Sequence, residues 1–199
     1  MKINLGCGNK LLEGYVNVDL YAPGAIQADI LTWKPEGLAD EVLAIHVVEH
    51  LRRDQVVPFL RHVRGYLAPG GKLIVEMPDR KKCLSLLRDD WSWRAGILGL
   101  MGDRTGDPVL FTDWVKWRES NRDAITDAVE SLDFASIHGM IPDQFRLPGQ
   151  QHEYVWSEAE FATACHEAGQ FWVTCSNPLF HGQRNYRDTR WVAERIDDV

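Results

Sequence analysis

KINLGCG at residues 2–8, followed by YVNVD at residues 15–19, decides the fold. The aliphatic residues of each segment predict a short strand. Gly6 and Gly8 end the first strand, and glycine lets the backbone turn sharply and approach a ligand closely because it has no Cβ. Asp19 ends the second strand, where a carboxylate can accept hydrogen bonds from both hydroxyls of a ribose. The two segments together predict a site for a ligand with an adenosine part.

The composition limits the class of protein. The chain has 199 residues, of which 45% are hydrophobic, as expected for one globular domain with a real core. Its formal net charge of -7 disfavours nucleic acid and membrane surfaces as partners. No segment has the roughly 20 apolar residues of a membrane span, and the N-terminus does not read as a signal peptide. The 4 scattered cysteines are typical of a protein in the reducing cytoplasm, where we expect this protein to be found. We expect it to be a monomer or a homodimer.

The N-terminal part of the chain, from Met1 to Asp79, alternates between strands and connections. The strands are predicted at Lys2–Leu5, Tyr15–Asp19, Ala25–Ala28, Glu41–Ile45 and Lys72–Met77. A helix is predicted over Asp54–Leu67, with Asp54 as its N-cap, and the residues Pro69-Gly70-Gly71 turn the chain into the fifth strand. This order is typical of a parallel sheet with connecting helices.

The same alternation returns at the end of the chain. Ser157–Ala168 is predicted to be a helix, with Ser157 as N-cap, Glu160 in the capping-box position and Gly169 at its end. Two last strands are predicted at Gln170–Cys175 and Thr189–Glu194.

The stretch between these parts, residues 80–156, is rich in Trp, Arg and Asp and has helical periodicity near Phe111–Leu132. We interpret it as a mainly helical insertion after strand five that covers the ligand edge of the sheet as a lid. The whole chain is then a single α/β domain, residues 1–199. It is expected to have a Rossmann-like, seven-stranded, mostly parallel sheet with helices on both faces. The first helix must be short, because only about ten residues separate Gly8 from Asp19.

Five motifs in this order resemble one family. They are LGCG at residues 5–8, the strand end at Asp19, ADI at 28–30, HVVEHL at 46–51 and LAPGGKLIVEMPD at 67–79. Together they resemble the class I S-adenosylmethionine-dependent methyltransferases, from the N-terminus as far as Asp79 and again, weakly, at GQQH, residues 149–152. The resemblance implies transfer of a methyl group from S-adenosylmethionine to an O, N or S atom, with S-adenosylhomocysteine as product.

The resemblance also implies the cofactor-binding residues. Gly6, Cys7 and Gly8 would wrap the methionine end. Asp19 would hold the ribose hydroxyls, Asp29 and Ile30 would flank the adenine, and His46 would lie beside the sulfonium. Leu20, next to Asp19, would be a further cofactor-binding residue. Many relatives carry an acidic residue in strand one, where this chain has Asn4. The cofactor contact of that position is therefore in doubt.

Three residues are candidates for a catalytic base. They are His152, His50 and Glu49, each of which could take a proton from an acceptor hydroxyl. Net negative charge and a large insertion favour a small-molecule or sugar-like acceptor. A non-catalytic binding or scaffold protein that keeps the fold is the alternative, because fold alone does not fix function.

Other interpretations of the same motifs are disfavoured. A dinucleotide fingerprint needs a third small residue where this chain has Leu11. His46-Val47-Val48-Glu49-His50 matches the zinc-peptidase pattern H-x-x-E-H, but His46 directly follows a buried strand and a helix spanning both histidines is not expected. No metal is therefore predicted.

Two further groups have two interpretations each. Arg80-Lys81-Lys82 either attracts an acidic substrate group or is a solvated helix start. The tryptophans of the insertion either line a substrate pocket or pack a small subdomain. They are Trp91, Trp93, Trp114 and Trp117.

Overall fold

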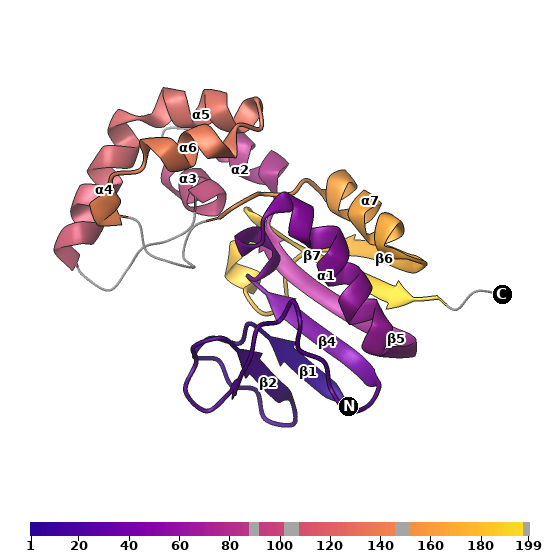
Figure 1. Ribbon diagram of the computed structural model, residues 1–199. Coiled ribbons are helices and arrows are strands. Elements are labelled where there is room, and N and C mark those ends of the chain that lie inside the picture. Colours follow the sequence, from indigo (N-terminus) through magenta and orange to yellow (C-terminus); the bar gives the residue numbers. More distant parts are fainter. Residues whose placement is uncertain (88–91, 102–107, 146–151, 197–199) are drawn as a thin grey trace.

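The computed structural model describes residues 1–87, 92–101, 108–145 and 152–196, and shows one seven-stranded sheet (Figure 1). The strand order is β3-β2-β1-β4-β5-β7-β6. Only β7 runs antiparallel to its neighbours. The strand bounds are β1 Lys2–Leu5, β2 Val16–Asp19, β3 Ile26–Gln27, β4 Ala39–Ile45, β5 Leu67–Pro78, β6 Phe171–Ser176 and β7 Asp188–Arg195. The predicted mostly parallel α/β sheet is confirmed.

The junction of α1 (Arg53–Tyr66) and β5 differs from the prediction. The helix begins after Arg52 instead of Asp54, and the Arg52 N–H donates to Gln55 Oε1 at 3.0 Å. Leu67 already pairs with Ala39, and the register shifts before Glu41 meets Lys72. The predicted turn at residues 69–71 is therefore an irregular start of β5 itself.

Helices α1 and α7 (Glu158–Ala168) lie side by side over one face of the sheet (Figure 1). The capping box of α7 is present, since Ser157 N–H donates to Glu160 Oε2 at 3.0 Å. On the opposite face the strands are covered by loops in the described part of the chain. The Leu179 N–H donates to the β5 carboxylate of Glu76 at 2.7 Å, and Trp172 of β6 is 65% exposed. The expectation of helices on both faces is corrected accordingly.

The first helix was expected to be short, and no helix at all joins β1 to β2. The connection consists of turns held by two asparagines from adjacent strands. The Asn4 side-chain amide donates to Lys10 O at 3.1 Å and to Asn17 Oδ1 at 2.9 Å, and the Leu12 N–H also donates to Asn17 Oδ1 at 2.9 Å. Asn4, the departure from the usual acidic residue, thus fixes the loop.

The insertion forms a helical layer beyond the carboxyl ends of the strands (Figure 1). Its helices are α2 Arg80–Leu87, α3 Trp93–Met101, α4 Pro108–Ser120, α5 Arg122–Glu130, α6 Phe134–Met140 and the 3-10 turn η2 Asp143–Phe145. The predicted periodicity over Phe111–Leu132 is interrupted at Asn121, which separates α4 from α5.

Two tryptophans of the insertion, Trp114 and Trp117, pack against aromatic neighbours. Trp114 and Trp117 stack with ring centroids 5.1 Å apart, and Phe145 tilts against Trp114 at 5.3 Å. Trp114 is fully buried, which supports the packing interpretation. Trp91 lies outside the described residues.

The basic run at the start of α2 anchors the insertion. Arg80 Nη2 pairs with Glu160 Oε2 at 2.6 Å, and its Nη1 donates to the Tyr154 hydroxyl at 3.0 Å. Lys82 Nζ donates to the carbonyl oxygens of Asn185 and Asp188, at 3.2 and 2.6 Å. Arg80 and Lys82 are therefore structural in this arrangement. No helix among the described residues is long and apolar enough to cross a membrane.

Candidate functional site

Two adjoining cavities open at the carboxyl ends of β1, β2 and β4. They have volumes of about 450 and 440 Å³ and share Gly6, Gly8 and Asn9 in their walls. This is the edge at which open α/β sheets bind ligands. A ligand lying across the glycine loop can therefore place one part in each cavity.

The glycine loop has a backbone that side chains disfavour. Gly6 and Gly8 have φ angles of 59° and 50°, in the left-handed region. A Cβ on Gly6 would lie 2.6 Å from Val47 Cγ2, whereas a Cβ on Gly8 would meet nothing within 4 Å. Gly6 is thus required by packing, and Gly8 leaves open space where a ligand can approach.

The Asp19 carboxylate closes this loop. Its Oδ2 accepts the Gly8 N–H at 2.9 Å, and its Oδ1 accepts the N–H groups of Tyr21 and Ala22 at 2.8 and 2.9 Å. Burial acts to raise the pKa of Asp19, but the three backbone hydrogen bonds outweigh it and lower the pKa. A carboxylate has about four acceptor positions. One acceptor position of the Asp19 carboxylate therefore remains for a ligand. The sequence had led us to expect contacts to both ribose hydroxyls.

Three further residues predicted to bind the cofactor line the second cavity together with Asp19. Leu20, Asp29 and Ile30 are all in its wall. The Asp29 carboxylate accepts the Leu31 N–H at 2.9 Å, which fixes the turn after β3. Cys7 lies in the wall of the first cavity, and its thiol pKa is raised by burial and by the charge of Asp19. The thiol is therefore protonated.

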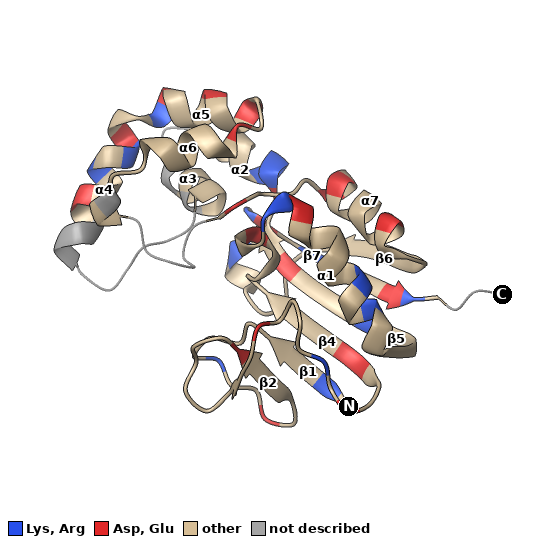
Figure 2. Ribbon diagram, viewed as in Figure 1, with Lys and Arg blue, Asp and Glu red and all other residues tan. Residues whose placement is uncertain are grey.

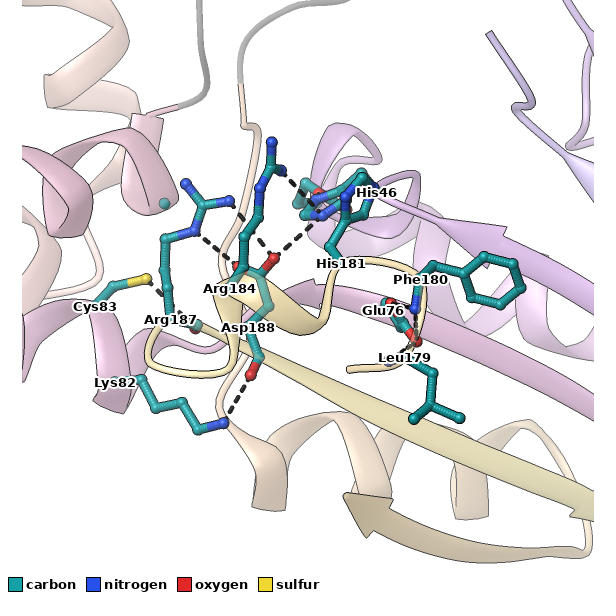
Figure 3. A network of polar contacts seen from close by, with 12 residues as sticks. His46, Glu76, Lys82, Cys83, Leu179, Phe180, His181, Arg184, Arg187 and Asp188 are labelled. Carbon is teal, nitrogen blue, oxygen red and sulfur yellow. Dashed lines mark hydrogen bonds and ion pairs between the residues drawn. The ribbon is translucent and has the colours of Figure 1, made fainter. Parts of the chain in front are cut away.

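His46 is held in the wall of the first cavity between two carboxylates (Figure 3). Its Nδ1 donates to Glu49 Oε1 at 2.8 Å and its Nε2 to Asp188 Oδ2 at 3.2 Å, with the backbone at a φ of 55°. Burial acts to lower the pKa of His46, but hydrogen bonds to Asp188 and Glu49 raise it to about 9. His46 is therefore an imidazolium at neutral pH and cannot act as a base.

The loop between β6 and β7 supplies a wall that the sequence analysis missed. Phe180, His181 and Arg184 line the first cavity, opposite Lys10 of the glycine loop. Lys10 Nζ lies 3.2 Å from His181 Nε2. Burial and the charges of His46, Lys10 and Arg184 lower the pKa of His181 to about 4, so its imidazole is neutral.

The position of this wall follows from the topology. Since β6 runs parallel to β5, its carboxyl end lies at the same edge as the glycine loop. Glu76 holds the loop there, because Oε1 accepts from Leu179 N–H at 2.7 Å and from Arg190 Nη1 at 2.8 Å (Figure 3). The polar run HGQR at residues 181–184 after the penultimate strand was the available sequence signal.

The three candidate catalytic residues come together, but outside the walls of these cavities. The rings of His50 and His152 are 5.0 Å apart, and one ligand atom from each histidine and from Glu49 lies within 4.8 Å of the others. His152 Nδ1 lies 2.8 Å from the Gly99 carbonyl oxygen. Burial and the charge of His50 lower the pKa of His152 to about 3. Residues 149–151 of the predicted GQQH element lie outside the described residues.

Comparison with solved structures identifies the fold. An S-adenosylmethionine-dependent methyltransferase from Clostridium acetobutylicum superposes with a TM-score of 0.56 at 11% identity, over 98% of this chain and 84% of that one. The chain has a methyltransferase fold. The 1,6-didemethyltoxoflavin-N1-methyltransferase of Burkholderia thailandensis, solved with S-adenosylhomocysteine, superposes with a TM-score of 0.54 at 13% identity. The match covers 98% of this chain and 71% of that one.

The same fold occurs in the small RNA methyltransferase HEN1, with a TM-score of 0.53 at 14% identity. The match covers 98% of this chain but only 24% of HEN1. The fold therefore gives no support to the predicted exclusion of nucleic acid, which rests on charge. No protein-family profile matches the sequence, and no curated protein matches it.

Proposed function

We propose that the protein is an S-adenosylmethionine-dependent methyltransferase. The observation that carries this proposal is the pair of cavities joined at the glycine loop, with Asp19 in one and His46 in the other. S-adenosylmethionine has an adenosine part and a charged methionine part joined at the sulfonium. The two cavities fit this division.

The cofactor would be held mainly by backbone and by a few polar side chains. Leu20, Asp29 and Ile30 would flank the adenosine, and the remaining acceptor position of Asp19 would take a ribose hydroxyl. The methionine end would lie over Gly6, Cys7 and Gly8, near the Lys10 ammonium, which can pair with its carboxylate.

The chemical step needs little from the protein beyond alignment. The positive sulfur already activates the methyl group, and holding two reactants in line can supply about 7–11 kcal/mol. A base adds about 10²–10⁴-fold in rate. We assign that role to His181 in preference to His152, His50 and Glu49, because His181 lies in the wall of the first cavity and the other three line neither cavity.

The acceptor is proposed to be a small molecule or sugar-like compound. The first cavity has a volume of about 450 Å³ and would hold the methionine end of the cofactor as well, so the space left for the acceptor suits a small molecule. Figure 2 shows both acidic and basic residues on α4 and α5, so these helices do not present a basic face to nucleic acid. Residues 80–156 would act as the lid, beside the wall formed by the β6–β7 loop.

Calorimetric titration of the intact chain tests the cofactor proposal. We expect S-adenosylmethionine and S-adenosylhomocysteine to bind with micromolar dissociation constants, and NAD to give no binding heat. Absence of binding to both sulfur compounds would favour the scaffold alternative. Methyl transfer from labelled cofactor to RNA, with none to a pool of small metabolites, would overturn the acceptor class.

A further inference from the structure

A buried carboxylate lies where the loop after β4 meets the return segment of the insertion. Glu49 is in the short 3-10 helix η1 (Val48–His50) and is fully buried. Its Oε1 accepts from His46 Nδ1 at 2.8 Å. Its Oε2 is buried too and has no hydrogen-bond partner within the described ranges of the chain. An unpaired carboxylate oxygen in the interior costs free energy unless a cation or donor compensates it.

Two imidazoles approach this carboxylate. One ligand atom from each of Glu49, His50 and His152 lies within 4.8 Å of the other two. The histidine rings meet edge to face, at 79° and 5.0 Å. His50 comes from the sheet edge and His152 from the far end of the insertion, so the fold brings together ligands that are distant in sequence.

The surrounding contacts orient two of the three side chains, those of His152 and Glu49. The His152 Nδ1–H donates to Gly99 O at 2.8 Å, which leaves Nε2 with its lone pair. His46 occupies Oε1 of Glu49, and Oε2 has no hydrogen-bond partner among the described residues. Metal-binding histidines commonly donate their second N–H to a carbonyl in this way. The Glu153 N–H donates to Glu49 O at 2.8 Å and holds the return segment beside η1.

We propose that Glu49, His50 and His152 bind one divalent transition-metal ion, of which Zn²⁺ is the best fit. Two imidazole nitrogens and one carboxylate oxygen suit Zn²⁺, with a fourth position open to water or a substrate atom. Mg²⁺ and Ca²⁺ prefer oxygen ligands throughout. Zinc bonds of about 2.0–2.1 Å place tetrahedral ligands about 3.4 Å apart, so binding draws the three side chains inward.

This site differs from the zinc-peptidase pattern that the sequence contains. In that pattern both histidines of H-x-x-E-H are ligands. Here His46 donates to Glu49 and Asp188, and His152 takes the place that His46 would have had. The sequence argument against zinc therefore excluded a helical site, and the structure assigns another one.

Metal binding is tested on the intact, untagged chain after chelation and dialysis, without cofactor or acceptor. Zn²⁺ is titrated by competition with a chromophoric chelator, and Co²⁺ is added separately to observe its visible absorption. The variants are Glu49→Gln, His50→Ala and His152→Ala. The control is His166→Ala, which removes an exposed histidine of α7. Circular dichroism shows which variants fold.

We expect one Zn²⁺ per chain, with affinity lowered at least about 100-fold in each folded ligand variant and unchanged in His166→Ala. Zn²⁺ should also raise the Tm of the wild type and of the control, but not of the ligand variants. A wild type that binds neither Zn²⁺ nor Co²⁺ would overturn the proposal. So would a folded Glu49→Gln that binds Zn²⁺ as tightly as the wild type. Neither outcome bears on cofactor binding.

Discussion

At the scale of single residues, Gly6 and Gly8 of the glycine loop have different roles. Gly6→Ala places a Cβ 2.6 Å from the buried Val47 at a positive φ. We expect it to destabilise the protein by about 2–4 kcal/mol through strain and overpacking. Gly8→Ala carries the strain alone, about 1 kcal/mol. Its Cβ projects into open space, so it should weaken S-adenosylhomocysteine binding at least about tenfold, which is about 1.4 kcal/mol.

Thermal unfolding and calorimetry separate the two glycine variants. The matched control is Gly14→Ala, which has a φ of 77° and open space around it but lines neither cavity. Gly14→Ala should reproduce the small stability loss and keep cofactor affinity. Equal cofactor affinity in Gly8→Ala and Gly14→Ala would contradict the proposed approach of the ligand to Gly8.

His181 carries the next prediction at this scale. With its pKa lowered to about 4, the imidazole is neutral throughout the physiological range. Replacing it by Ala should lower the methyl-transfer rate about 10²-fold, and leave S-adenosylmethionine affinity within a few-fold. The matched comparison is His62→Ala in α1, whose ring contacts the Trp33 carbonyl and lines neither cavity. Equal rates for both variants would remove His181 from the mechanism.

How far the sequence predicts the site depends on how local each contact is. Gly6, Gly8 and Asp19 lie at the ends of two adjacent parallel strands, so the local pattern was enough to place them at one edge of the sheet. The roles of His46 and His181 depend on contacts between the N-terminal strands and the β6–β7 region, including Asp188, at the other end of the chain. No local pattern contains such a contact, and the expected position of His46 at the sulfonium did not reveal its two carboxylate partners.

At the scale of elements, one buried carboxylate fixes the β6–β7 loop. Glu76 accepts hydrogen bonds from the N–H groups of Leu179 and Phe180 and from Arg190. Glu76→Gln loses the charge and one acceptor oxygen, and should destabilise the protein by about 2 kcal/mol. Because the loop lines the cavity, cofactor affinity should fall as well. Urea unfolding and calorimetry measure the two effects.

A control for Glu76 exists on the same sheet. Glu194 of β7 pairs with Lys72 at 3.5 Å, and the two side chains are 43% and 48% exposed. Glu194→Gln should change stability by less than about 0.5 kcal/mol. The role given to Glu76 is wrong if its Gln variant behaves like that of Glu194.

The limits of element prediction have a similar cause. The strands, and the helices that pack on them, could be predicted because burial of one or both faces makes apolar residues recur at a regular spacing. The turns of the first connection are held by the side-chain contact of Asn4 with Asn17, and α4 and α5 are separated at Asn121. Both events depend on single polar residues, which periodicity does not detect.

At the scale of the whole molecule, a polar network on α7 contacts both ends of the insertion. Arg80 begins the insertion and Tyr154 ends it, and both contact Glu160 of α7, at 2.6 and 2.9 Å. The Ser157 hydroxyl donates to the same carboxylate at 2.7 Å. The attachment of both ends of the insertion to α7 therefore depends in part on the charge of Glu160.

This dependence predicts how stability changes with pH. Burial acts to raise the pKa of Glu160, but hydrogen bonds from Ser157, Arg80 and Tyr154 lower it from 4.5 to about 2. A depressed carboxylate pKa stabilises the fold above the unfolded-state pKa, and this contribution is lost as pH falls from 4.5 to about 2. Glu160 is partly exposed, so we expect Glu160→Gln to cost about 1 kcal/mol at pH 7. The stabilities of variant and wild type should converge near pH 2, whereas Glu167→Gln, on the exposed side of α7, should follow the wild type at every pH. Urea unfolding across this range measures both, and a Glu160→Gln deficit that persisted undiminished to pH 2 would show that the network acts by packing instead of charge.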